Sequence, residues 1–129
     1  MNINFFEQVY SYRELCIKKD LREIAMWGRL LEDINEELGD LIKLEKQMIN
    51  NLKLAGTLQA LRRDVILCTA GFCKFEQELQ KELEYGKNEY GDLHIQLIEK
   101  HRMRYLKIVE NLAMLKRNVH QRLLEKRIK

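Results

Sequence analysis

Apolar residues recur at intervals of three and four along the last third of the chain, from Asp92 to Lys129. Residues at that spacing lie on one face of an α-helix, because a helix makes one turn in about 3.6 residues. They fall within a sector of roughly 80°, which is narrow and typical of a helix packed against other helices. We therefore predict one long amphipathic helix. Its predicted core face consists of Leu97, His101, Tyr105, Ile108, Leu112, Leu115, Val119 and Leu123.

Two earlier stretches show the same spacing, so the pattern predicts three long helices. The first stripe consists of Ile24, Trp27, Leu31, Ile34, Leu38, Leu41, Glu45, Met48 and Leu52. The second stripe consists of Leu61, Val65, Cys68, Phe72, Phe75, Leu79 and Leu83. The chain contains no proline, so nothing forces a break in any of the three helices. No stretch shows the sustained alternation that would predict a β-strand.

Turn signals divide these stripes. We predict a turn at Ala55-Gly56-Thr57 and a loop from Tyr85 to Gly91, with Asp92 capping the third helix. Within the first stripe the phase is lost near residue 19, and Gly39 marks a second candidate kink or break. Short loops join antiparallel neighbours. The prediction is an all-α protein: an antiparallel bundle of three long helices with coiled-coil-like packing, the first helix continuous or split near residues 19 and 39, in one domain spanning residues 1–129.

Positive charge is concentrated at the carboxyl end of the chain. From residue 100 onward there are ten Lys and Arg against two acids, so the first 99 residues carry a net charge of −5 within a total of +3. A nucleic acid or an anionic surface could bind these bases. The bases flank the core face on both sides instead of forming one stripe, which favours pairing with acids on neighbouring helices. The candidate phosphate or partner contacts are Arg102, Arg104, Lys107, Lys116, Arg117 and Arg122.

The sequence offers no arrangement that indicates an enzyme. The Glu-x-x-His motif of di-iron bundles is absent, and no glycine-rich phosphate loop occurs. His94 and His101 are seven residues apart on one helix face, where they could either bind a metal with an acid from another helix or interrupt the core face and set its register. Cys68 and Cys73 point too far apart on a helix to share one zinc ion. We predict no catalytic residues, no metal and no cofactor.

Three cysteines without a signal peptide indicate reduced thiols and a cytoplasmic location. No apolar run is long enough for a membrane span. The small residues from Cys68 to Gly71 indicate a close helix crossing, a bend or a ligand groove. Trp27 falls on the core face and is expected inside, whereas Tyr85 and Tyr90 flank the predicted loop and are candidate partner anchors or staples for the helix ends.

The leading hypothesis is a non-enzymatic interaction module that binds a protein partner, or a second copy of itself, through apolar helix faces. It would act as an adaptor, a chaperone-like binder or an assembly subunit. The alternative is a nucleic-acid-binding protein that uses its basic third helix on phosphates.

Overall fold

The computed structural model describes residues 2–86 and 89–128, and it describes no side chains at residues 2–6, 9–10 and 127–128. It contains three helices: α1 (Asn2–Leu44), α2 (Leu52–Tyr85) and α3 (Asp92–Ile128). A π-helical turn, η1 (Glu45–Ile49), follows α1 directly. The described residues contain no β-strand, so the predicted all-α fold class is confirmed.

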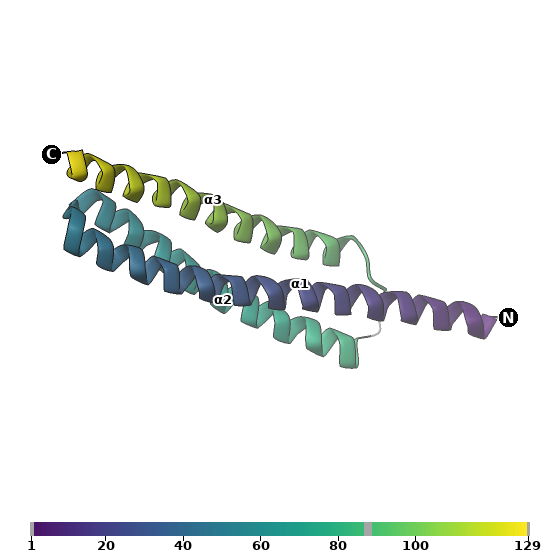
Figure 1. The fold of residues 1–129 in the computed structure, drawn as a ribbon. Helices are drawn as coiled ribbons and strands as arrows, with labels where there is room; N and C mark the ends of the chain where they lie inside the picture. Colours follow the sequence, from purple (N-terminus) through teal and green to yellow (C-terminus); the bar gives the residue numbers. More distant parts are fainter. Residues whose placement is uncertain (1, 87–88, 129) are drawn as a thin grey trace.

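The three helices form an elongated bundle (Figure 1). α1 and α2 run antiparallel and pack closely, and α3 returns parallel to α1 with fewer contacts to either helix. The amino-terminal end of α1 extends beyond the loop that joins α2 to α3 (Figure 1). One continuous apolar core follows the bundle axis. Its fully buried side chains include Ile17, Ile24, Leu31, Leu38, Leu58, Val65, Cys68, Phe72 and Val119.

The first helix is continuous at both positions where the sequence allowed a break. α1 passes through Lys19 and Asp20 without interruption, and Asp20 is buried inside the helix instead of capping a new one. Gly39 is also helical, and the guanidinium of Arg62 on α2 lies 3.9 Å from where its Cβ would be. An exposed helical glycine costs about 1 kcal/mol relative to alanine, which packing against α2 readily offsets.

The predicted turn at Ala55-Gly56-Thr57 is wrong, because these residues lie in the first turns of α2. The chain turns instead at Asn50, whose φ of 59° and ψ of 54° place it in the left-handed region. Asn51 then caps α2, its side-chain oxygen accepting from Leu54 N at 2.9 Å. Leu52, assigned from the sequence to the first core face, is 93% exposed.

A buried carboxylate fixes this turn. Glu45 is 5% exposed, its Oε2 accepts the backbone N–H of Asn51 at 2.8 Å, and its carbonyl oxygen accepts from Asn50 N at 2.8 Å. Two backbone donors that would otherwise be orphaned at the helix junction are thereby satisfied. The acidic residue at a core-face position thus closes the hairpin between α1 and α2.

The loop between α2 and α3 lies where the sequence placed it, between Gly86 and Gly91. Gly91 occupies the position before the helix, since its carbonyl accepts from Ile95 N, and Asp92 is the first helical residue. The core face of α3 is as predicted except at its start, where Ile98 is buried and Leu97 is 38% exposed.

Within the described residues, none of the helices combines the length and the apolar character needed to cross a membrane.

Candidate protein-binding surface

Two ion pairs fix how α1 and α3 lie side by side. Arg102 donates to Glu23 Oε2 at 2.8 Å, and the ammonium of Lys116 lies 2.6 Å from Glu37 Oε1. Each pair joins residues 79 positions apart, so the two parallel helices keep one register over four turns. Leu30 and Val109 share that separation and lie seven residues from each pair, midway between them.

Trp27 supports the contact between α1 and α3 from inside the bundle. It is 4% exposed, its ring stacks on Tyr105 of α3 at 5.9 Å and contacts Phe72 of α2 at the same distance. The guanidinium of Arg102 lies 5.6 Å from the Trp27 ring, a cation–π contact that adds to its pairing with Glu23. Trp27 is therefore a core residue, as expected, and it joins all three helices.

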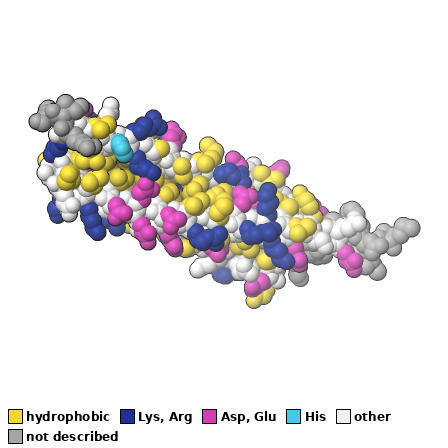
Figure 2. Space-filling model, in the orientation of Figure 1, with side chains coloured by type: hydrophobic (Ala, Val, Ile, Leu, Met, Phe, Trp, Pro, Cys, Tyr) yellow, Lys and Arg dark blue, Asp and Glu magenta, His cyan; other side chains and the backbone are white. Residues whose placement is uncertain are grey.

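On the solvent side of Trp27, four apolar side chains remain partly exposed. Met26 and Leu30 of α1 are 44% and 38% exposed, and Leu106 and Val109 of α3 are 48% and 37% exposed. By the common register they lie next to one another between the two ion pairs. Figure 2 shows hydrophobic side chains in the band between α1 and α3, with charged groups on its borders. These four residues are called the α1–α3 apolar strip.

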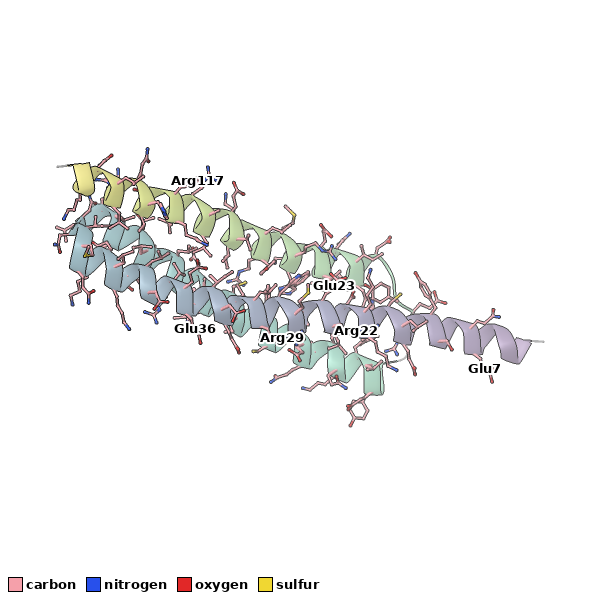
Figure 3. All side chains as sticks on the ribbon, in the orientation of Figure 1. Glu7, Arg22, Glu23, Arg29, Glu36 and Arg117 are labelled. Atoms are coloured by element: carbon pink, nitrogen blue, oxygen red, sulfur yellow. The ribbon has the colours of Figure 1, made fainter. Side chains whose placement is uncertain are left out.

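The six predicted basic contacts do not form one surface. Arg102 and Lys116 are held by acids of α1, and the guanidinium of Arg104 lies over Gly71 of α2, 3.0 Å from where a Cβ would be. The small residue at Gly71 thus accommodates an arginine of α3. The remaining three are distributed along α3, with Arg122 near Asn118 and with Lys107 and Arg117 exposed (Figure 3).

The two candidate tyrosine anchors have different surroundings. Tyr85, the last residue of α2, is 78% exposed. Tyr90 is half-buried, and its hydroxyl donates to Asp20 Oδ2 of α1 at 2.5 Å. Burial and the carboxylate of Asp20 raise the pKa of the Tyr90 phenol, so the hydroxyl keeps its proton. Tyr90 therefore attaches the loop to α1. Of the two tyrosines, only Tyr85 is available to a partner.

A polar cluster around Tyr90 was not foreseen from the sequence. Arg13 is 3% exposed and reaches the backbone carbonyl and the carboxylate of Glu82 on α2. His94 stacks on Tyr90 at 4.9 Å, lies 3.9 Å from Glu82, and its Nδ1 accepts from Gly91 N at 3.3 Å. Sequence spacing within one helix cannot reveal such a cluster, because its members come from three helices.

Burial shifts the pKa of one histidine and of one cysteine. His101 packs against Phe72 and Phe75, and burial, with the charge of Arg104, lowers its pKa. No group of three or more His, Cys, Asp or Glu in the described part of the chain could hold a metal ion. The cysteines are free, and burial raises the pKa of the Cys68 thiol, which disfavours the reactive thiolate.

Comparisons with known proteins add no identity. No protein-family model matches the chain, no curated protein matches it, and no solved structure matches it.

Proposed function

We propose that this protein is a non-enzymatic interaction module that binds another protein chain through the α1–α3 apolar strip, as an adaptor, a chaperone-like binder or an assembly subunit. The observation that supports this proposal is the strip itself: four adjacent apolar side chains, each more than a third exposed, between two interhelical ion pairs. Contiguous apolar surface of this kind, rimmed by polar groups, marks interaction sites.

Physical chemistry favours a helix as the bound element. The strip lies between two parallel helices, and a third helix can place residues at three- and four-residue spacing against such a surface. Burial of apolar area contributes about 25 cal/mol per Å². The helices are already folded, so little ordering cost opposes binding. Charged residues along both borders then select orientation more than they add affinity.

The compartment is part of the proposal. The three cysteines are free, and two of them are at least partly accessible, which suits a reducing environment such as the cytoplasm.

Site-specific crosslinking tests the module. A photoreactive amino acid replaces Leu106 in the cell of origin, with the exposed Gln59 of α2 as the matched control position. We expect one or a few discrete protein adducts at position 106 and none at position 59. Leu30→Glu, at a side chain already 38% exposed, should abolish those adducts while leaving helix content unchanged. Equal labelling at both positions, or adducts that survive Leu30→Glu, would contradict the proposal.

The nucleic-acid alternative has a separate test. Arg102 and Lys116 are already held by Glu23 and Glu37, so at most four of the six bases are available to phosphates. We expect no retardation of RNA or duplex DNA at about 50 mM salt, whereas phosphate binding would give a shift that disappears at about 200 mM.

A further inference from the structure

The outward face of α1 carries charges separated by sign. Arg22 and Arg29 lie toward the amino terminus, and Asp33 and Asp40 lie toward the α1–α2 turn, all four of them exposed. Figure 2 shows basic side chains over one half of α1 and acidic ones over the other, and Figure 3 places Arg22, Arg29 and Glu36 in that order along the helix. Lys18 extends the basic half, and Glu32 and Glu36 extend the acidic half.

The spacing of the four charges reads the same in both directions. Successive members are seven, four and seven residues apart, so they fall in one line within about 40° on the helix. The reversed order exchanges the signs: two bases followed by two acids become two acids followed by two bases. Along the helix, the midpoint of both the outer pair and the inner pair falls at the level of Leu31, a buried residue on the opposite side of α1.

The acidic part of this arrangement is unfavourable within one chain. Like charges three or four residues apart on a helix repel, and the acidic half places Glu32, Asp33, Glu36 and Asp40 at those separations. None of the ion pairs found in the described part of the chain involves Arg22, Arg29, Asp33 or Asp40. Within the described residues, these four side chains are therefore not committed to an ion pair of the bundle.

We propose that a second copy of this chain binds here, with its α1 antiparallel to the first. Arg22 of each copy then faces Asp40 of the other, and Arg29 faces Asp33, which makes four intermolecular pairs around a two-fold axis. Such an interface is isologous, the form that closes into a dimer. This inference rests on the proposed function, since it names a second copy as the protein chain that the module binds.

The charge order selects the second copy over other partners. A parallel arrangement would place like charges together, and a uniformly charged partner would be repelled by half of the face. Arg29 and Asp33 lie two residues from the axis and Met26 lies five residues from it, so the interface is mainly charged and Met26 adds apolar surface beside the central pairs. The small apolar area predicts a weak dimer, with a Kd on the order of micromolar, that salt weakens further.

Two complementary variants test the arrangement in the purified full chain. Arg22→Glu/Arg29→Glu makes all four of these positions acidic, and Asp33→Lys/Asp40→Lys makes all four basic. By sedimentation equilibrium, we expect each variant alone to associate at least tenfold more weakly than the unmodified chain. An equimolar mixture of the two should form a heterodimer, because all four pairs then have opposite signs. Circular dichroism confirms that both variants remain helical.

Control variants place the same charge changes elsewhere: Arg63→Glu/Lys81→Glu and Glu76→Lys/Glu89→Lys, all at exposed positions off this face. They should dimerise like the unmodified chain. A chain that stays monomeric at about 1 mM, or complementary variants that fail to associate when mixed, would overturn the dimer. If Leu106 is nevertheless crosslinked to a different protein, the interaction module stands and only its partner is wrong. If neither result is obtained, both proposals fail.

Discussion

The contact between Tyr90 and Asp20 shows how single residues position the loop that leads into α3. Asp20 is 4% exposed inside α1, and the Tyr90 hydroxyl is its hydrogen-bond donor. Burial raises the pKa of the Asp20 carboxyl, because the charged form loses solvation, and the hydrogen bond from Tyr90 only partly opposes this effect. Asp20 therefore stabilises the fold less when its carboxyl group is ionised than when it is protonated.

The pH dependence of the variant Asp20→Asn follows from that shift. With the pKa higher in the folded state than in the unfolded state, the folded state binds the proton more readily, so stability falls as pH rises between the two values. Asparagine keeps an acceptor for Tyr90 and does not ionise. We expect Asp20→Asn to raise the free energy of unfolding, relative to the unmodified chain, more at pH 7 than at pH 3, measured by urea denaturation.

Asp64→Asn, at an exposed aspartate of α2, is the control for this measurement. Its stability relative to the unmodified chain should vary less between the two pH values. A difference for Asp20→Asn that is flat between pH 3 and pH 7 would show that Asp20 is as well solvated in the folded protein as in the unfolded chain.

At the scale of elements, the junction between α1 and α2 depends on two successive asparagines. Asn50 adopts the left-handed conformation, which costs an ordinary residue roughly 1–2 kcal/mol but suits glycine and asparagine. We expect Asn50→Ala to lower the free energy of unfolding by about 1 kcal/mol and Asn50→Gly to change it by less than about 0.5 kcal/mol, by urea denaturation.

Asn118→Ala is the matched control, since Asn118 is an exposed residue within α3. It should be neutral or slightly stabilising, because alanine favours helices over asparagine. If Asn50→Gly were as destabilising as Asn50→Ala, the side chain of Asn50, and not its backbone conformation, would be what the turn requires.

The helices could be predicted from the sequence because burial on one side imposes a period on the chain, as in Val65, Cys68, Phe72 and Phe75. The turn could not be predicted in the same way. Gly56 was the stronger local signal, yet it fits within α2, and nothing lies within 4 Å of where its Cβ would be. Local turn signals compete, and only the packing of α1 on α2 decides which one is used.

The sequence predicted which types of residue form the candidate surface, but not where on the bundle they meet. The charge pattern predicted that bases of the third helix pair with acids of its neighbours, and Lys116 does so with Glu37. The register that brings Leu30 beside Val109 depends on how two helices separated by α2 slide against each other. No single-helix period contains that information. The palindromic charges from Arg22 to Asp40 were visible in the sequence, but their common exposure was not.

For the whole molecule, α1 and α2 form the stable part and α3 the less stable one. α1 and α2 share the most extensive contact, whereas α3 touches both more sparingly and exposes Met103, Leu106 and Met114. Regions with fewer buried contacts open more readily and exchange their amide hydrogens sooner. We expect the amides of α3 to exchange at least tenfold faster than those at the centre of α1 and α2, as one cooperative group.

Two core variants separate local opening from global unfolding. Leu112 of α3 is 6% exposed, and Leu58 of α2 is fully buried. Truncating either side chain to alanine should lower the stability of the helices packed around it by about 2–5 kcal/mol. Leu112→Ala should accelerate exchange in α3 and leave the centres of α1 and α2 nearly unchanged, because these already remain closed when α3 opens. Leu58→Ala should accelerate exchange at the centres of α1 and α2. Mass spectrometry after hydrogen exchange measures both. If Leu112→Ala accelerated all three helices equally, the bundle would unfold only as a unit, and α3 would be as firmly held as the other two.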